Sequence, residues 1–511
     1  MKKFFLTTAI DYANGRPHIG HAYEKILADV ISRIARLSGK DVYFLTGLDE
    51  HGQKVEQSAI NRGVTPKALC DEVADDFKAL CSTLNISYDH YIRTTDEYHR
   101  SFVQKCLQQL FDAGEIYKAE YTGIYSLSAE RFVQEKDKVD GEWPADYGHV
   151  TEITETNYFF RLKKHQRWLI DHIETHPDFV YPKFRAKQVL EFLKEPINDL
   201  CISRPKERLS WGIELPFDKE YVTYVWFDAL LNYVSGTNFG DKILGDHWPA
   251  DYHIIGKDIL VPAHSIYWPI MLHVLGYELP KTLLTHGWWL LSGEKMSKSS
   301  GNIVDPLDYI KQFGPDPFRY YLMREMNVGQ DCDFNHDRFV TRYTTDLGND
   351  LGNLLSRIVN MLHRYCKGIV PGFDVGDPAL GELRELWNAT KRGVLSEYQT
   401  LTFNTALERL FAFISFANKF IEQNAPWKLA KSPESSDQAR LKTVLAAAAE
   451  SVRLATLLLA PVMPSTAPKI LSSLGATPEV TWNSLEFGSC LWNKTVTENV
   501  ILFPRWEQNL S

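Results

Sequence analysis

The chain has 511 residues, more than a single hydrophobic core usually organises, and we therefore expect two or three domains. Hydrophobic residues make up 44% of the chain and charged residues 24%, which excludes disordered and fibrous proteins. The formal net charge of -9 disfavours a general nucleic-acid binder, so any RNA-binding surface must be local.

The seven cysteines are scattered along the chain and form no Cys-x-x-Cys pair. The sequence therefore predicts neither a disulfide framework nor a metal site built from thiolates. No apolar stretch approaches the roughly 18 residues of a membrane helix. The first residues also lack the cleavage pattern of a signal peptide. We expect a cytoplasmic protein with no membrane segment.

The N-terminal residues predict a strand, a helix and a second strand. Residues 4–10 are a short apolar run, Pro17 can open a helix, and apolar residues recur at helical spacing over 19–37. Residues 41–49 are apolar on both faces, as in a buried parallel strand. This order predicts half of a doubly wound parallel sheet, whose ligands bind beyond the carboxyl ends of the strands.

The middle of the chain predicts an insertion into this sheet. Helical patterns cover 66–84 and 97–113, and alternating apolar residues then indicate an inserted α+β domain over 116–222. We expect the sheet to resume at 221–227 and again at 252–256, where short apolar runs return.

Beyond about residue 340 the sequence is helical almost throughout, with the 3.6-residue period over 347–365, 380–420 and 438–459. The fold class is therefore α/β, a Rossmann-type doubly wound parallel sheet with an inserted α+β connective domain and a C-terminal all-α helix bundle. The predicted segments are the first half of the Rossmann domain (1–115), the inserted domain (116–222), the second half (223–290), a linking region (291–345) and the helical domain (346–511).

The motif His18-Ile19-Gly20-His21 opens the first predicted helix. Two imidazoles at i and i+3 share one helix face, and the N-terminal amides of a helix favour an anion. Gly20 removes a side chain, so that a nucleotide can lie against the backbone. Hydrogen-bond donors aimed at the α-phosphate oxygens would stabilise a charged transition state. We expect a triphosphate site with His18 and His21 as catalytic residues.

A second motif, Lys295-Met296-Ser297-Lys298-Ser299, follows the predicted sheet. Two ammoniums separated by small, flexible residues can move over a leaving pyrophosphate. Lys295 and Lys298 are the catalytic candidates here. The expected ATP-binding residues are Gly20, Lys295, Ser297, Lys298 and Ser299.

These two motifs, intact and in this order, resemble the signature pair of class I aminoacyl-tRNA synthetases. The resemblance implies that both motifs meet at the phosphate chain of one ATP, with Mg²⁺ offsetting the phosphate charge. Further segments are similar to the methionyl enzymes of this class and extend the resemblance over nearly the whole chain: 7–15 (TTAIDYANG), 46–52 (TGLDEHG), 224–229 (YVWFDA), 256–258 (GKD) and 264–269 (HSIYWP).

The resemblance to the methionyl family implies two steps, formation of methionyl-adenylate and transfer of methionine to the 3′-terminal adenosine of tRNA(Met), for initiation and elongation of translation. The implied methionine-binding residues are Ala9, Ile10, Tyr12, Asp49, Trp226, Ala229, Tyr233 and His264. Aromatic and apolar walls with one weak donor to sulfur suit a straight, polarizable side chain. The Asp49 carboxylate would hold the ammonium.

Other members of the class fit less well. The inserted interval is too short for the editing insertion of the branched-chain enzymes, and no cysteine precedes Cys70 to serve a cysteinyl enzyme. Many methionyl enzymes carry Cys-x-x-Cys knuckles in the insertion, but this chain has no cysteine between Cys106 and Cys201. We therefore expect no structural zinc.

In the helical domain, Asn353 and Arg357 at i and i+4 and the pair Pro426-Trp427 resemble the family's anticodon contacts. An amide and a guanidinium can read exposed base edges, and an indole can stack on an unpaired base. This domain would therefore be the anticodon-binding bundle. No further RNA-binding or dimerisation module is recognisable near the C-terminus, so we expect a monomer.

Two other functions remain open from the residues alone. A small-molecule adenylyl or nucleotidyl transferase also uses an HxGH motif, although it would leave the helical domain unexplained. A tRNA-binding or regulatory protein related to synthetases usually loses catalytic residues, whereas both motifs are intact here. Exchange of pyrophosphate with ATP, measured with each amino acid, separates the three functions.

Overall fold

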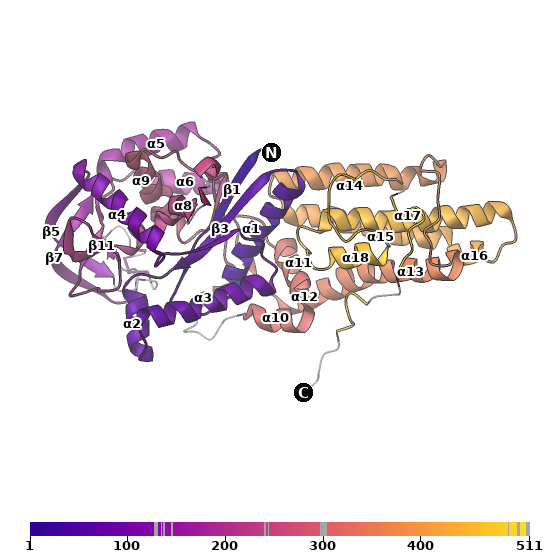
Figure 1. The fold of residues 1–511 in the computed structure, drawn as a ribbon, viewed down its shortest axis with the longest axis horizontal. Helices are drawn as coiled ribbons and strands as arrows, with labels where there is room; N and C mark the ends of the chain where they lie inside the picture. The colour runs from indigo at the N-terminus through magenta and orange to yellow at the C-terminus, as the bar shows by residue number, and fades with distance from the viewer. Residues whose placement is uncertain are drawn as a thin grey trace. The chain divides into compact units, whose positions relative to one another are not determined.

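The structure is a computed structural model of the chain and describes residues 1–126, 131–133, 135, 138–139, 141–144, 147–239, 242–243, 245–296, 304–488, 490–497 and 501–506. The chain divides into two compact units (Figure 1). The sheet unit comprises Met1–Pro17, Asp41–Ala79 and Tyr88–Gly287. The helical unit comprises His18–Lys40, Leu80–Ser87 and Trp288–Ser511.

A seven-stranded sheet forms the centre of the sheet unit. Its order is β2-β3-β1-β15-β16-β8, with β4 paired to β3, and every pairing is parallel. The strands are β1 (Lys3–Thr8), β2 (Asp11–Tyr12), β3 (Asp41–Asp49), β4 (His90–Arg93), β8 (Val180–Tyr181), β15 (Tyr252–Gly256) and β16 (Leu283–His286). The predicted parallel sheet is confirmed. Strand β3 lies on one side of β1 and β15 on the other, so the strand order reverses at β1. Open α/β sheets bind their ligands at such a switch point.

The insertion builds its own antiparallel sheet in the order β6-β5-β7-β9. Its strands are β5 (Ile116–Ser126), β6 (Arg131–Val133), β7 (Val150–Phe160) and β9 (Leu200–Cys201). The long strands β5 and β7 pair in one continuous register from Ile116 opposite Phe160 to Ser126 opposite Val150. A two-stranded ribbon follows, β13 (Asn238–Phe239) with β14 (Lys242–Ile243).

The prediction that the main sheet resumes at residues 221–227 is wrong. Strand β12 (Asp218–Thr223) pairs antiparallel with β10 (Ser203–Pro205) and β11 (Glu214–Leu215) in a separate sheet. Helix α7 (Val225–Leu230) follows it directly. A short apolar run suits a buried strand and a buried helix equally, so its periodicity could not distinguish them. The prediction for residues 252–256 is confirmed as β15.

Two of the remaining helices before residue 288, α3 and α4, match the predicted patterns and end one residue before the expected positions, whereas the others were not predicted. The remaining helices are α2 (Gln53–Arg62), α3 (Pro66–Thr83), α4 (Glu97–Asp112), α5 (Gln166–Thr175), α6 (Lys183–Phe192), α8 (Asn232–Ser235), the kinked segment η5 (Leu260–Tyr267) and α9 (Trp268–Leu275).

The helical unit combines α1 with a long bundle (Figure 1). Its helices are α1 (Ile19–Leu37), α10 (Pro306–Phe313), α11 (Pro315–Glu325), α12 (His336–Arg342), the π-helical η6 (Tyr343–Gly352), α13 (Asn353–Cys366), α14 (Gly381–Gln399), α15 (Phe403–Asn424), α16 (Pro426–Leu429), α17 (Ser435–Leu459) and α18 (Ala467–Ser473). A small sheet in the order β18-β17-β19 joins β17 (Trp289–Leu291), β18 (Glu294–Lys295) and β19 (Cys332–Asp333).

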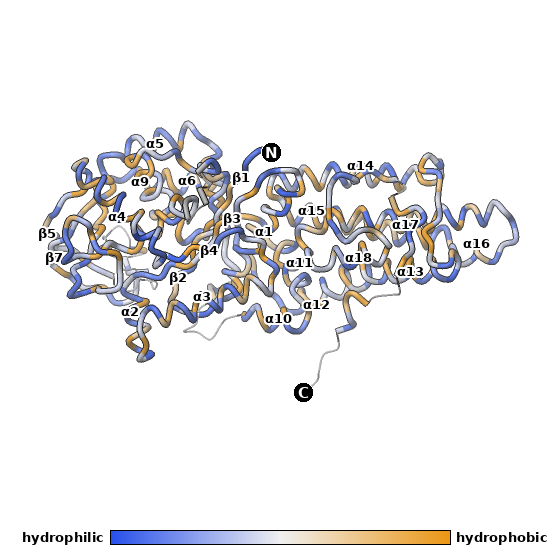
Figure 2. Tube along the Cα trace, in the orientation of Figure 1, coloured by the Kyte–Doolittle hydropathy of each residue, from blue (hydrophilic) through white to orange (hydrophobic). Residues whose placement is uncertain are grey.

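The helical pattern predicted over 380–420 forms two helices, α14 and α15, because the chain turns at Leu401, which has a φ of 60°. Each helix buries an apolar stripe, and Figure 2 shows apolar and polar residues alternating along the bundle helices. The predicted all-α bundle is confirmed.

A buried arginine joins α1 to the rest of the helical unit. The Arg319 side chain on α11 is fully buried, and its Nη2 donates to Asp29 Oδ2 on α1 at 2.7 Å. The same guanidinium donates to the carbonyl oxygens of Leu84, Pro461 and Val462 at 3.0, 2.9 and 2.8 Å. Four segments far apart in the sequence are therefore held by one side chain.

Replacing Arg319 by methionine is expected to lower the free energy of unfolding by about 3–5 kcal/mol, because the buried Asp29 carboxylate loses one of its two arginine partners and three buried carbonyl oxygens lose the guanidinium. Thermal unfolding of the purified chain measures the loss. Arg338→Met is the matched control: Arg338 is likewise one of two arginines on a carboxylate, Glu325, which keeps Arg342, but its side chain is 51% exposed. A control that destabilised the chain as much as Arg319→Met would contradict the interpretation.

This stabilisation should also depend on pH. Burial would raise the pKa of the Asp29 carboxyl, but the Arg319 and Arg33 guanidiniums hold this pKa below its ordinary value. The carboxylate therefore contributes stability that is present above the ordinary aspartate pKa of about 3.9 and is lost as the pH falls through the depressed value.

Candidate active site

The carboxyl edge of the parallel sheet collects the first predicted residues. Strand β1 ends at Thr8, whose Oγ1 lies 2.7 Å from Thr46 Oγ1 on β3. The Ala9 N–H then donates to the Ile254 carbonyl oxygen on β15 at 3.0 Å. The ends of β1, β3 and β15 are thus aligned at the edge where the fold predicts a ligand.

Asp49 is the last residue of β3 and is 9% exposed. The backbone beyond Asp49 is fixed by the hydrogen bonds of Glu50. Its carboxylate accepts from Arg93 and Thr95, and the Glu50 backbone N–H donates to Thr94 Oγ1 at 2.9 Å. Arg93 in turn contacts Asp71 at 2.6 Å. The predicted ammonium-binding carboxylate therefore stands at the head of a rigid, hydrogen-bonded turn.

Aromatic side chains meet at the same edge of the sheet. Ala9, Tyr12, Trp226 and Tyr233 pack in one apolar cluster, whereas Ile10 packs in another. The ring of Trp226 lies perpendicular to that of His264, with centroids 6.0 Å apart. The Ala229 side chain is buried on the same helix as Trp226. The structure therefore brings most of the predicted methionine residues together.

The hydrogen bonds of His264 determine its tautomer. Nδ1 lies 2.9 Å from the Ile259 carbonyl oxygen, which can only accept, so Nδ1 carries the proton of the neutral ring. Nε2 then accepts from the Tyr233 hydroxyl at 2.8 Å. The Tyr233 hydroxyl proton is thus engaged by His264. The pair offers aromatic faces and a phenol oxygen to a straight apolar side chain.

The HxGH residues form the start of α1 in the helical unit. His18 is the N-cap residue: its Nδ1 accepts from the Gly20 N–H at 3.0 Å, and His21 Nδ1 accepts from the His18 N–H at 3.1 Å. The two rings lie 3.8 Å apart. Because each Nδ1 accepts, the neutral rings carry their protons on Nε2. Two ring N–H donors are therefore held at one helix N-terminus.

Gly20 has a structural reason in addition to the predicted one. A Cβ atom built on it would lie 2.9 Å from Cε1 of His18. The absent side chain makes room for the capping imidazole, and this need is independent of a nucleotide. The sequence could not indicate this need for space, because the His18 ring lies over Gly20 only when it caps the helix.

The second motif is described only in part. Lys295 ends β18, with its backbone paired opposite Leu290 of β17. Ser297, Lys298 and Ser299 lie outside the described residues, so the predicted meeting of the two motifs stays a prediction. Within the helical unit, Trp289 of β17 contacts Tyr23 of α1, with ring centroids 6.1 Å apart. The hairpin that leads into the second motif is therefore held against the helix that carries the first.

Comparisons with known proteins agree with these observations. A family model described as "tRNA synthetases class I (M)" matches residues 4–149 and 147–359, and one described as "Anticodon binding domain of methionyl tRNA ligase" matches residues 379–495. The methionine–tRNA ligase of Caldanaerobacter subterraneus is 42% identical over 508 residues, which cover 99% of this chain and 79% of that protein. The chain belongs to the methionyl-tRNA synthetases. It is therefore a class I ligase that joins methionine to tRNA.

Two further relatives support this membership of the methionyl-tRNA synthetases. The methionine–tRNA ligase of Clostridium perfringens is 43% identical over 509 residues, covering 99% of this chain and 78% of that protein. The solved structure of Mycobacterium tuberculosis methionyl-tRNA synthetase in complex with methionyl-adenylate has a TM-score of 0.93 and 40% identity, covering 99% of this chain and 100% of that chain. The predicted family and fold class are confirmed.

The predicted anticodon residues of this methionyl-tRNA synthetase lie in the bundle. Asn353 is exposed at the start of α13, and Arg357 one turn later contacts Glu422 of α15 at 3.3 Å. Pro426 is buried and opens α16, and Trp427 is 38% exposed. The Arg357–Glu422 ion pair brings α13 to the end of α15. This helix ends at Asn424, two residues before Pro426. Trp427 is too exposed to be a core residue.

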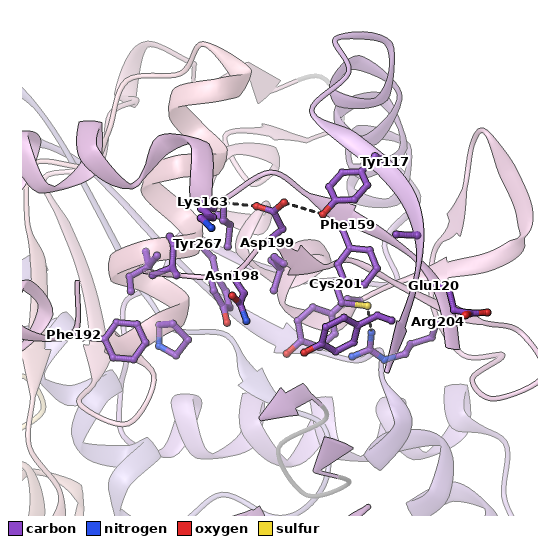
Figure 3. Close-up of a pocket in the computed structure, with 18 residues that line it drawn as sticks. Tyr117, Glu120, Phe159, Lys163, Phe192, Asn198, Asp199, Cys201, Arg204 and Tyr267 are labelled. Carbon is purple, nitrogen blue, oxygen red and sulfur yellow. Dashed lines mark hydrogen bonds between the residues drawn. The ribbon is translucent and has the colours of Figure 1, made fainter. Parts of the chain in front are cut away.

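A cavity of about 460 Å³ lies in the sheet unit beside the segments that carry Trp226 and His264 (Figure 3). Tyr117, Phe159 and Arg204 line it, and Asp199 accepts from the Tyr117 hydroxyl at 2.9 Å. None of the predicted site residues lines this cavity. It shares the neighbouring segments, however, because Tyr224 precedes α7 and Tyr267 ends η5, which also carries His264.

Among the described residues, no group of three or more His, Cys, Asp or Glu side chains is arranged to hold a metal ion. Of the helices in the described part of the chain, none has the length and apolar character needed to cross a bilayer.

The sequence analysis assigned no role to two residues that the structure shows to be candidates for function. His51 and Asp228 stood inside the quoted motifs without a role of their own, yet their side chains are 2.6 Å apart and buried. The signal that could have found them is a titratable residue within two positions of a predicted binding residue, because His51 lies two residues after Asp49 and Asp228 directly precedes Ala229.

Proposed function

We propose that the chain activates L-methionine with Mg²⁺-bound ATP and transfers it to tRNA(Met), and that it acts as a monomer in the cytoplasm without a structural zinc. The observation that carries the choice of amino acid is the apolar group of Trp226, Tyr233 and His264 at the same sheet edge as the Asp49 carboxylate. An ammonium needs a carboxylate, and a thioether side chain needs apolar walls.

In the first step, a methionine carboxylate oxygen attacks the α-phosphorus of ATP. The bond from this phosphorus to the oxygen that bridges the α- and β-phosphates breaks, and pyrophosphate leaves with the electron pair. Negative charge grows on the α-phosphate oxygens, so donors placed there lower the barrier. We assign this role to the Nε2–H groups of His18 and His21 and to the Lys295 and Lys298 ammoniums. Gly20, Ser297 and Ser299 would complete the ATP site.

In the second step, the 3′-terminal ribose hydroxyl of the tRNA attacks the carbonyl carbon of the adenylate. The bond from the carbonyl carbon to the oxygen of the mixed anhydride breaks, AMP leaves with that oxygen and the electron pair, and the hydroxyl proton is released. Ala9, Ile10, Tyr12, Asp49, Trp226, Ala229, Tyr233 and His264 form the proposed methionine site through both steps. The support is the hydrogen bond that aligns Ala9 with β15, the apolar cluster shared by Ala9, Tyr12, Trp226 and Tyr233, and the ring contacts of His264 with Trp226 and Tyr233.

Exchange of labelled pyrophosphate into ATP, measured with each of the standard amino acids, tests the proposed amino-acid specificity. We expect exchange with methionine and none above background with leucine, isoleucine or cysteine. Exchange without any amino acid but with another nucleophile would indicate a nucleotidyl transferase. An absence of exchange together with tRNA binding would indicate a regulatory protein.

We further propose that Asn353, Arg357, Pro426 and Trp427 bind the anticodon, and Trp427→Ala tests this part. The exposed indole can stack on an unpaired base, which is worth about 1–3 kcal/mol by substitution. We expect the KM for tRNA(Met) in aminoacylation to rise about tenfold or more, with pyrophosphate exchange unchanged. Trp492→Ala is the control, because Trp492 is 58% exposed in the same unit. An equal loss for both variants would contradict the assignment.

A further inference from the structure

Asp228 is a fully buried carboxylate between two histidines. Its Oδ2 lies 2.6 Å from Nδ1 of His51, and its Oδ1 lies 2.8 Å from Nε2 of His99. Nδ1 of His99 lies 2.7 Å from Oγ of Ser235. Asp228, His99 and Ser235 are 0–1% exposed and His51 is 5% exposed. The sheet unit therefore contains a closed polar network whose members come from four segments.

The protons of this network can be placed. Burial would raise the pKa of Asp228, but the imidazoles of His51 and His99 hold this pKa below its ordinary value, so the carboxylate is ionised near neutral pH. An ionised carboxylate only accepts, hence Nδ1 of His51 and Nε2 of His99 are both donors. In a neutral His99, Nδ1 then accepts from the Ser235 hydroxyl at 2.7 Å, while the other acceptor near this hydroxyl, the Asn232 carbonyl oxygen, is farther away at 3.3 Å. Both imidazole–carboxylate bonds are charge-assisted and therefore strong.

The network spans the proposed methionine site without belonging to it. His51 is two residues beyond Asp49, the proposed ammonium-binding residue at the end of β3. Asp228 lies on α7 between Trp226 and Ala229. Ser235 lies on α8 two residues after Tyr233. One set of hydrogen bonds thus connects the segment that would hold the ammonium to the segments that would hold the side chain.

We propose that Asp228 is a positioning residue for methionine binding, which sets the spacing between the Asp49 carboxylate and the aromatic wall of Trp226 and Tyr233. The inference rests on the proposed function. A ligand that contacts both ends must match this spacing, and small misplacements of binding groups are costly. His99 and Ser235 support the carboxylate from the side of α4 and α8.

Asp228→Asn is the main test. Asparagine offers one acceptor and one donor, so one of the two imidazoles must lose its bond or change tautomer. In pyrophosphate exchange we expect the KM for methionine to rise about tenfold or more, while kcat and the KM for ATP change less than about threefold. A merely structural residue would lower the amount of folded enzyme and leave both KM values unchanged.

A double-mutant cycle with Asp49 makes the test specific. If Asp228 acts through the spacing to Asp49, its effect on the KM for methionine should largely disappear in an Asp49→Asn background. Asp251→Asn is the matched control, since Asp251 also accepts two hydrogen bonds, from the Phe5 N–H and Lys281, but precedes β15 at the opposite edge of the sheet. We expect this control to leave the KM for methionine unchanged.

His51 provides a second pair of variants in case Asp228→Asn fails to fold. The amide nitrogen of asparagine can take the place of imidazole Nδ1, so His51→Asn should keep the KM for methionine near that of the unmutated chain, whereas His51→Ala should raise it. Additive effects in the cycle, or equal KM values for His51→Ala and His51→Asn, would overturn this inference alone. Absence of methionine-dependent exchange in the unmutated chain would overturn the proposed function as well.

Discussion

Replacing His21 by glutamine is expected to slow methionine-dependent pyrophosphate exchange about 10²–10³-fold, the usual loss when one donor to a developing oxyanion is removed. Nδ1 of His21 accepts the His18 N–H at 3.1 Å, which leaves the ring proton on Nε2. Glutamine at this helix position can also accept that N–H, so the start of α1 should be preserved. The variant therefore separates the capping function of His21 from its proposed catalytic function.

Steady-state exchange at saturating methionine measures this effect, and we expect the KM for methionine to change less than about threefold. His336→Gln is the matched control, because His336 is an exposed histidine at the start of α12 in the same unit. Thermal unfolding of His21→Gln should match that of the unmutated chain. A normal exchange rate for His21→Gln would exclude a catalytic role for this imidazole.

Replacing Asp49 by asparagine is expected to raise the KM for methionine about 100-fold, because an ammonium in a nearly buried site would lose its counter-charge. Asp49 is 9% exposed and ends β3, where hydrogen bonds from Thr95 and Arg93 to Glu50 fix the following backbone. Asparagine has the same shape, so the turn itself should persist. The KM for ATP should change little, since the proposed ATP residues lie elsewhere in the chain.

Exchange kinetics with methionine varied at fixed ATP measure this prediction. Asp41→Asn is the control, because Asp41 is an exposed residue at the opposite end of the same strand. A parallel rise in the KM for ATP would show that Asp49→Asn disturbs the whole sheet edge. A KM for methionine within about threefold of the unmutated value would remove Asp49 from the ammonium site.

Several elements could be predicted because their signals are local. The strand at 41–49 and the helix at 19–37 were predicted at the bounds that the structure has, since polar residues and a glycine interrupt each apolar pattern. The run at 221–227 was misassigned for the opposite reason: a short stretch that is buried on all sides carries no period. The turn at Leu401 was missed because nothing in its neighbours requires a positive φ.

The candidate site shows the same division. The motifs identified the family and the residues proposed to bind substrates, but the hydrogen-bond partners of those residues could not be deduced. The sequence did not indicate that Gly20 leaves room for the His18 ring, or that His264 carries its proton on Nδ1. Both features depend on where a neighbouring group lies in space.

The sequence by itself determined the class of enzyme, the fold class, and the first strand–helix–strand unit with the motif at its helix start. Only the tertiary structure decided that Asp228 lies against His51, 177 residues away, and that Arg319 lies against Asp29, 290 residues away. Periodicity and capping act over a few residues, whereas such pairs form only when packing of the whole core brings distant segments together. The protonation and orientation of the site residues follow from these distant contacts.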